Sequence, residues 1–234
     1  MITMKIRIPA IVLFILLLSS LSFAQENKMV QFQMAIIRKG PKWTNKKNTE
    51  IKKRHEKHFK YVLSLLDSGK AVIAGQFSDS SDIAAVFILR AASADEARAW
   101  IEADPEIKSG QLAAEIHPWW SEDIFKKGST PARLEIVYFG FLKRGPNRKE
   151  GDGQTPEVQA LQKAHIANIN QLAATKKLVM AGPFGGNGDL RGIFVFRVGS
   201  LKEAQHLAAT DPMIKIDRLR LELHPWTVPA GVIP

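Results

Sequence analysis

The stretch Ala74-Gly75-Gln76-Phe77 recurs 107 residues later as Ala181-Gly182-Pro183-Phe184, and this recurrence decides the fold. The stretch Glu115-Ile116-His117-Pro118-Trp119 recurs at the same offset as Glu222-Leu223-His224-Pro225-Trp226. When residues 58–119 are aligned on residues 165–226 without a gap, 22 of the 62 positions are identical. A repeat of this length indicates one structural unit that occurs twice in tandem.

Each copy has the pattern strand, helix, strand, strand, helix, strand. In the first copy we predict strands at 30–37, 70–74, 83–89 and 112–117, with helices at 49–67 and from 93 to about 104. The βαββαβ order with both helices on one face of an antiparallel sheet is the ferredoxin-like arrangement. The other face needs an apolar partner. We therefore predict an α+β protein whose two tandem ferredoxin-like domains pack sheet to sheet as an intrachain pseudo-dimeric α/β barrel. Phe87 and Phe194 should occupy equivalent core positions.

Three local signals define the helices of the repeat. Phe59, Val62, Leu63 and Leu66 form an apolar stripe at helical spacing, and Gly69 should end that helix. Ser93 with Glu96, and Ser200 with Glu203, have the spacing of a capping box at the start of the second helix. Asp104-Pro105 and Asp211-Pro212 should close the second helix of each copy, because a residue before proline is disfavoured in helical conformation.

Residues 1–24 have the order of a secretory signal peptide. Lys5 and Arg7 precede an apolar run at 8–18, and small residues lead to Ala24. The alternative is a membrane anchor, but a run of about 11 residues is shorter than the roughly 20 that span a bilayer. We expect cleavage after Ala24, export to the periplasm or the medium, and no stable membrane insertion afterwards.

The remaining chain divides into a first domain at 29–120, a polar linker at 121–132 and a second domain at 133–228. The chain carries a formal net charge of +10, and loss of Lys5 and Arg7 with the leader would lower it to +8. No aromatic interleaving accompanies the basic residues, so we expect a solvated basic face and no nucleic-acid partner. The chain has no cysteine, which excludes disulfides and thiolate chemistry.

Four motifs of the second copy resemble the YciI-like (YCII-related) family. They are the helix-one histidine His165, the Ala181-Gly182-Pro183 stretch, Asp211-Pro212 and the closing Pro225-Trp226. The first copy departs from this pattern at Gln76. The resemblance implies the dimeric α/β-barrel superfamily, which also holds muconolactone-isomerase-like enzymes and small monooxygenases. It also implies a histidine–aspartate site, with lactone isomerisation or dehydrohalogenation among the chemistries of relatives.

Two histidine–aspartate pairs are the candidate catalytic residues: His58 with Asp104, and His165 with Asp211. The residues of each pair are separated by 46 positions. A carboxylate bonded to one imidazole nitrogen sets the tautomer and raises the basicity of the other nitrogen, which suits proton abstraction beside a carbonyl. The alternative is that each aspartate only shapes its Asp-Pro turn and each histidine is a polar residue at the helix edge.

Four further residues are candidates for substrate binding. His117 and His224 end the last strand of each copy and could line the same cleft, although packing over a tryptophan is the competing interpretation. Arg90 and Arg197 end the third strand and could hold an anionic substrate, although solvated cations are common at such positions.

No metal site is predicted. His55 and His58 are spaced i and i+3, whereas the helical zinc motif needs i and i+4, and Gln162 replaces His55 in the second copy. The run 185–188 joins two strands as a hairpin turn and opens no helix, so it is not a phosphate loop.

The sequence favours a cofactor-independent isomerase or lyase that transfers protons on a small acidic or lactone-like molecule. The alternative is a non-catalytic module that binds a small molecule or another protein. A haem- or metal-using enzyme is a third class, for which no residue is identified as an axial ligand. Assembly beyond the intrachain pseudo-dimer is left open.

Overall fold

The computed structural model describes residues 28–46, 48–128 and 133–234. The first copy contains β1 (Met29–Lys39), α1 (Thr49–Asp67), β2 (Ala71–Phe77), β3 (Ile83–Leu89), α2 (Ala94–Glu102), α3 (Pro105–Lys108) and β4 (Leu112–Glu122). The second contains β5 (Leu134–Arg144), η1 (Asp152–Gln154), α4 (Pro156–Ala174), β6 (Leu178–Pro183), β7 (Leu190–Phe196), α5 (Leu201–Ala208), α6 (Pro212–Lys215) and β8 (Leu219–Pro229). The predicted leader and residues 129–132 of the predicted linker lie outside the described residues.

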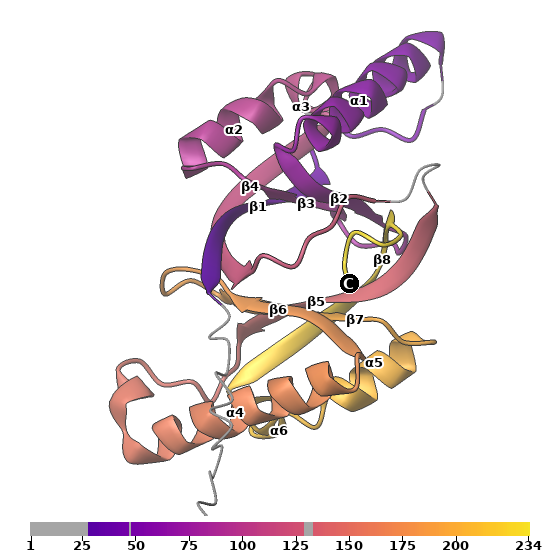
Figure 1. Cartoon of the computed structure of the whole chain (residues 1–234). Helices are drawn as coiled ribbons and strands as arrows, with labels where there is room; N and C mark the ends of the chain where they lie inside the picture. The colour runs from indigo at the N-terminus through magenta and orange to yellow at the C-terminus, as the bar shows by residue number, and fades with distance from the viewer. Residues whose placement is uncertain (1–27, 47, 129–132) are drawn as a thin grey trace, which may run out of the picture.

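The two copies share one antiparallel sheet of eight strands in the order β4-β1-β3-β2-β8-β5-β7-β6. The sheet curls into a barrel with the helices outside (Figure 1). One seam pairs Phe77 of β2 with Trp226 of β8, and the opposite seam is a bridge between Trp119 and Phe184. The α+β pseudo-dimeric barrel predicted from the repeat is confirmed, with the addition that the two sheets also join edge to edge.

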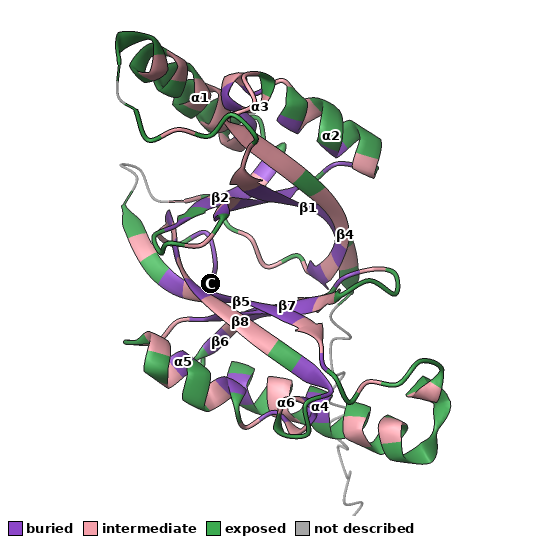
Figure 2. Ribbon diagram, turned by 180° about the vertical axis from the view of Figure 1, so that it is seen from behind, coloured by how far each residue is buried: buried purple, intermediate pink, exposed green. Residues whose placement is uncertain are grey.

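Three apolar clusters hold the barrel together. The first fills the barrel interior with side chains from both copies, among them Trp119, Phe139 and Trp226. The other two lie between the sheet and the helices of each copy, where Phe87 and Phe194 are buried at equivalent positions as predicted. Figure 2 shows this layering as buried strands between helices whose outer faces are exposed.

The apolar stripe predicted for α1 is confirmed at Val62 and Leu66, which pack against the cluster under the helix, and is wrong at Phe59 and Leu63. Phe59 and Leu63 are 60% and 41% exposed, whereas Leu65 is buried against the sheet. Tyr61 and Val62 pack beside Leu65 in the cluster under α1. The side of the helix that carries Tyr61, Val62 and Leu65 therefore faces the sheet. A buried helical face is about 100° wide, and α1 has more apolar residues at helical spacing than fit within one such face.

The helix caps follow the predicted pattern with one correction. Ser93 accepts a hydrogen bond from the backbone of Glu96, and Ser200 accepts one from Glu203. The carboxylates of these two glutamates accept bonds from the residue before each cap. Asp104 does not simply end a helix, because it caps the start of the short α3, as Asp211 caps α6.

The chain itself fills much of the barrel interior. β4 continues to Glu122, five residues beyond the predicted strand and into the predicted linker, because β1 pairs with it as far as Met29. Ile124 and Phe125 of the predicted linker then pack against the interior cluster, together with the buried C-terminal residues Val232 and Ile233. Ile124 and Phe125 of the predicted linker, and Val232 and Ile233 of the C-terminal tail, thus belong to the core of the barrel interior.

Arg90 and Arg197 hold these two segments. Arg90 makes two hydrogen bonds to Asp123, at 2.6 and 2.7 Å. Arg197 bonds to Glu135 and to the backbone carbonyls of Ile233 and Pro234. Both arginines therefore already have carboxylate partners within the chain, and neither lines the cavity beside His165.

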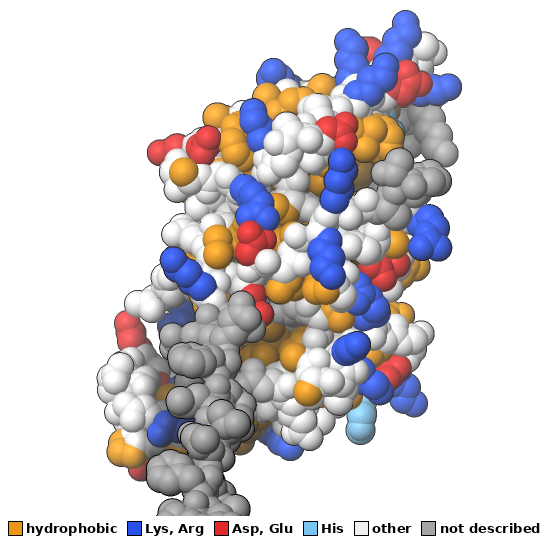
Figure 3. Space-filling model, viewed as in Figure 1, with side chains coloured by type: hydrophobic (Ala, Val, Ile, Leu, Met, Phe, Trp, Pro, Cys, Tyr) orange, Lys and Arg blue, Asp and Glu red, His pale blue; other side chains and the backbone are white. Residues whose placement is uncertain are grey.

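The basic residues do not form one continuous surface in the view of Figure 3. Lys and Arg side chains are scattered over both copies with Asp and Glu among them. In the described part of the chain, no helix has the length and apolarity needed to cross a membrane.

Candidate functional site

The structure brings the residues of both histidine–aspartate pairs into contact. Nδ1 of His58 lies 2.7 Å from Oδ2 of Asp104, and Nδ1 of His165 lies 2.5 Å from Oδ2 of Asp211. The pair in the second copy is the more enclosed, since the Asp211 side chain is 0% exposed and that of His165 is 11% exposed. The aspartate carboxylate can only accept, so Nδ1–H is the donor in each pair.

Each aspartate uses its two oxygens for different partners. Oδ1 of Asp104 accepts from the backbone of Glu106, and Oδ1 of Asp211 accepts from Met213 and Ile214. Oδ2 is left to the histidine. The turn role and the histidine contact therefore coexist, and the cap fixes the direction of the carboxylate that receives the imidazole.

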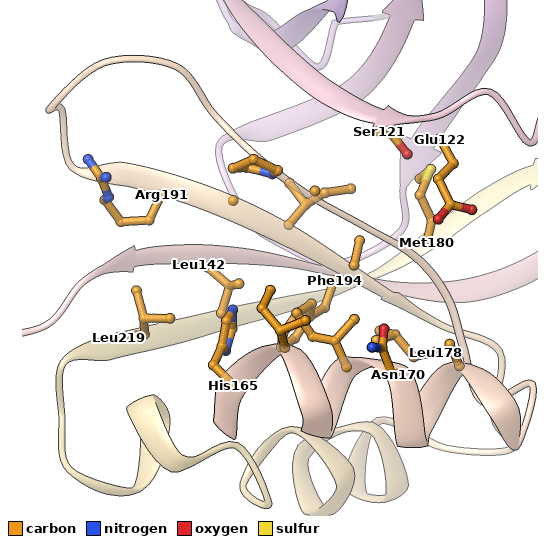
Figure 4. Close-up of a pocket in the computed structure, with 18 of the residues that line it drawn as sticks. Ser121, Glu122, Leu142, His165, Asn170, Leu178, Met180, Arg191, Phe194 and Leu219 are labelled. Carbon is orange, nitrogen blue, oxygen red and sulfur yellow. The ribbon is translucent and has the colours of Figure 1, made fainter. Parts of the chain in front are cut away.

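A cavity of about 400 Å³ opens beside the second pair. His165 rises from α4 toward the strands and stands next to Leu142 and Phe194 (Figure 4). The Phe194 ring lies nearly parallel to the imidazole at a centroid separation of 6.1 Å. Nε2 of His165 has no hydrogen-bond partner within the described chain, and this is the nitrogen that the aspartate leaves available.

The cavity is lined from both copies. α4 supplies Gln162, His165 and Asn170, while β6 and β7 supply apolar side chains such as Met180 and Ile193. Ser121 and Glu122 at the end of β4 enter from the first copy. A ligand here would therefore contact the seam between the copies as well as the histidine.

The surroundings of the first pair differ. Arg54 bonds to the buried Glu106 at a distance of 3.0 Å, where the second copy has Leu161 and Met213 at the equivalent positions. An internal ion pair thus occupies the flank of His58 that is apolar beside His165. Burial, and then the negative charge of Asp104, raise the pKa of Tyr61 in this copy.

Sequence reasoning missed the two cations of the cavity, Arg148 and Arg191. The candidate residues were chosen because both copies retain them. Arg148 and Arg191 are not retained, since Trp43 and Ala84 stand at the aligned positions of the first copy. Comparing the copies for charged residues that differ would have identified them.

His117 and His224 do not meet at one site. Nδ1 of His224 lies 2.6 Å from Oδ2 of Asp79 in the first copy, and Nε2 lies 3.1 Å from Glu222. Its ring stacks on Phe77. His117 lies edge-on to Phe184 and has a long 3.4 Å contact with Glu115, but no counterpart of Asp79, because Gly186 stands at that position. Neither histidine lines the cavity beside His165.

Asp79→Asn should weaken the contact between the copies in a pH-dependent manner. Burial works to raise the pKa of Asp79, but hydrogen bonds involving His224 and Ser81 outweigh it and hold that pKa below its ordinary value of 3.8. The carboxylate therefore stabilises the native state above that pH, and its contribution disappears as the pH falls through the lowered pKa. We expect a loss of about 1–2 kcal/mol at neutral pH, measured by urea unfolding.

The control for this prediction is Asp82→Asn in the same loop. The Asp82 side chain is 86% exposed and lies 3.7 Å from Lys39, so its replacement should change little. Equal losses for the two variants, or a loss for Asp79→Asn that does not shrink as the pH falls from 7 to below 3.8, would contradict the assigned role of the Asp79–His224 contact.

Among the described residues, no group of three or more His, Cys, Asp or Glu side chains is arranged to hold a metal ion. His55 contacts Glu106 at 3.9 Å and stacks near His58.

Sequence comparison identifies one family. The family model of the YCII-related domain matches residues 32–120 and again residues 144–227. No curated protein matches the chain.

Solved structures with the same fold are distant in sequence. A mutant chlorite dismutase from Candidatus Nitrospira defluvii has a TM-score of 0.57 at 14% identity, over 86% of this chain and 92% of that chain. A haem-binding protein from Thermus thermophilus has a TM-score of 0.51 at 13% identity, over 86% and 92% of the two chains. At these identities the likeness establishes the fold alone.

Proposed function

Since the chain belongs to the YCII-related domain family, and since a histidine–aspartate pair borders a cavity in its second copy, we propose that it is a cofactor-independent enzyme that transfers protons on a small molecule. The observation that carries the proposal is His165, which lines a cavity of about 400 Å³. Asp211 holds its Nδ1, and its Nε2 has no partner in the described part of the chain. Cavities of this size suit small organic ligands.

The proposed step uses His165 as general base. Nε2 takes a proton from a carbon beside a carbonyl, and the electron pair of that C–H bond moves toward the carbonyl oxygen as an enolate. Where a carbon–carbon double bond lies β,γ to the carbonyl, this enolate is a dienolate. The resulting imidazolium is stabilised by Asp211 and returns the proton to the γ carbon, which moves the double bond into conjugation with the carbonyl and completes an isomerisation. A positioned base of this kind contributes about 10²–10⁴-fold.

The first copy is assigned a lesser part. His58 and Asp104 have the same contact, but the Arg54–Glu106 ion pair lies beside them and the two cavity arginines have no counterpart there. We propose that proton transfer occurs in the second copy and that the first copy mainly supports the barrel.

Deuterium exchange tests this function without knowledge of the natural substrate. The protein is incubated in D₂O with levulinate, which has exchangeable protons beside its ketone, and with α-angelica lactone, which isomerises by proton transfer. We expect incorporation above the buffer rate, followed by ¹H NMR, and its loss in His165→Ala. Ligand binding without exchange, unchanged by that substitution, would favour the alternative of a non-catalytic binding module.

Haem binding is a second candidate, because the Thermus thermophilus protein with the same fold is described as a haem-binding protein. The donor set in the cavity fits it, because metal-ligating histidines commonly bond their other ring nitrogen to a carboxylate, as His165 does with Asp211. His165 would be the iron ligand, and Arg148 and Arg191 would face the haem carboxylates. Bound haem would supply redox chemistry at its iron. Titration with haemin decides between the candidates, since only haem binding predicts a Soret shift that His165→Ala abolishes.

Export is a further part of the proposal. It is supported by the basic, apolar and small-residue order of positions 1–24. Mass spectrometry of the protein produced in a host with its own export machinery should give a mature chain that begins near Gln25. A mass that still includes residues 1–24 would turn the interpretation toward a membrane-tethered protein.

A further inference from the structure

One end of the cavity beside His165 carries positive charge that the chain leaves partly unbalanced. Arg191 lines this end, and its Nη1 donates to the carbonyl oxygen of Gly186 at 3.0 Å (Figure 4). Its Nε is buried and has no hydrogen-bond partner among the residues that the structure describes. The side chain is thus held by the turn between β6 and β7 while donors remain unused, and a buried donor without a partner is costly.

Arg148 adds a second cation at the same cavity. Burial, and then repulsion from Arg191, Arg218 and Arg144, hold the pKa of Arg148 below its usual range. The nearby carboxylate of Asp152 is already bound by Arg218 through two hydrogen bonds, at 2.6 and 2.8 Å. In the described chain no carboxylate forms an ion pair with Arg148, so an external anion would relieve the repulsion.

The opposite end of the cavity has different chemistry. Ser121 and Glu122 stand there beside Met180, away from Arg191 (Figure 4). The Glu122 side chain has no hydrogen bond or ion pair with the described residues. Between the two ends the wall is mostly apolar, with His165 and Asn170 as polar side chains on it (Figure 4). A second negative charge on a ligand would therefore meet the Glu122 carboxylate.

We infer that the cavity binds an amphipathic molecule with a single anionic group. Its carboxylate or phosphate pairs with Arg148 and Arg191, its apolar body lies along the wall formed by Met180 and Ile193, and its far end is uncharged and faces Glu122. This inference rests on the proposed function for the role of His165 and names the class of substrate on which that histidine acts. The anionic group fixes one end of the molecule and brings its middle to Nε2.

Ligand binding belongs to the second copy. Trp43 and Ala84 occupy the positions of Arg148 and Arg191 in the first copy, and Leu63 occupies that of Asn170. A repeat that keeps its histidine–aspartate pair but lacks both cations has no equivalent anion site.

Calorimetric titration of the full chain with four eight-carbon probes tests the inference. Octanoate and octyl phosphate carry one anionic group, octanamide carries none, and octanedioate carries one at each end. We expect octanoate or octyl phosphate, or both, to bind about ten- to a hundredfold more tightly than octanamide, the range of a charge-assisted hydrogen bond. Which of them binds more tightly distinguishes a carboxylate substrate from a phosphate substrate. Octanedioate should bind more weakly than octanoate.

Four variants, one of them a control, assign the effect to residues. Arg148→Gln and Arg191→Gln should each remove most of the preference for the anion and leave octanamide unchanged. Arg98→Gln, on the exposed face of α2, is the matched control and should bind as the unmodified protein does. Glu122→Gln should raise the affinity for octanedioate toward that for octanoate.

The inference would be overturned by equal affinity for octanoate and octanamide, or by no binding of octanoate and octyl phosphate. Anion binding that survives both arginine substitutions would overturn it as well. Failure of the proposed function has a different signature. In that case octanoate or octyl phosphate binds and its affinity depends on the arginines, while levulinate shows no deuterium exchange above the buffer rate.

Discussion

Replacing Asp211 by Asn is expected to lower proton transfer by about 10²–10⁴-fold while the fold survives. Asn preserves an oxygen that accepts from the backbone of Met213 and Ile214, and Asn is as good a helix cap as Asp. Its amide group, however, presents a donor to Nδ1 of His165. The imidazole must then place its proton on Nε2, which removes the lone pair that faces the cavity.

Two measurements separate this effect from a loss of structure. Deuterium exchange reports the rate, and ¹⁵N NMR of the histidine ring reports the tautomer without any substrate. Asp104→Asn is the matched control in the first copy and should leave the exchange rate nearly unchanged. If Asp211→Asn instead lowers the melting temperature and leaves both the tautomer and the rate unaltered, the aspartate serves only as the cap of α6.

Trp226→Ala should produce the largest loss of stability, about 3–5 kcal/mol, which is the usual range for removing a fully buried large aromatic side chain. Trp226 is 0% exposed and packs edge-on to Phe139 with ring centroids 5.1 Å apart. It also lies so close to the backbone of Gly75 that a Cβ placed there would be 2.3 Å from its Nε1. The substitution therefore opens a cavity in the barrel interior at the β2–β8 seam.

The expected loss is a large share of the roughly 5–15 kcal/mol that stabilises a typical domain. Urea unfolding measures it, and Trp43→Ala is the control. Trp43 is 42% exposed, so its removal should cost no more than about 0.5 kcal/mol. A cost below 1 kcal/mol for Trp226→Ala would mean that the seam between the copies does not depend on this ring.

Much of the fold follows from the repeat because hydrophobic periodicity and caps are local properties. The element order, the cap at Ser93 and the burial of Phe87 could all be predicted from nearby residues. Which side of α1 faces the sheet could not be predicted from nearby residues. Phe59 and Leu63 match the helical spacing as well as Leu65 does, and only the position of the sheet decides which side of α1 is buried.

For the candidate site, too, part could be predicted from the sequence and part depends on tertiary packing. Retention of His165 and Asp211 in both copies marked them as candidates, but their 2.5 Å contact depends on how α4 and α6 pack. Arg90 and Arg197 were also retained in both copies, and the structure shows them bound to the linker and the C-terminal tail. Retention in a repeat does not distinguish a ligand contact from a structural one.

The sequence by itself determined that one βαββαβ unit occurs twice, that each unit carries a histidine and an aspartate 46 residues apart, and that no thiol takes part. Only the tertiary structure decided that the cavity lies beside the second pair and is charged at one end by Arg148 and Arg191. The reason is physical. Secondary structure depends on residues within a few positions, whereas a cavity and its charge depend on side chains from strands and loops that are distant in sequence and that differ between the two copies.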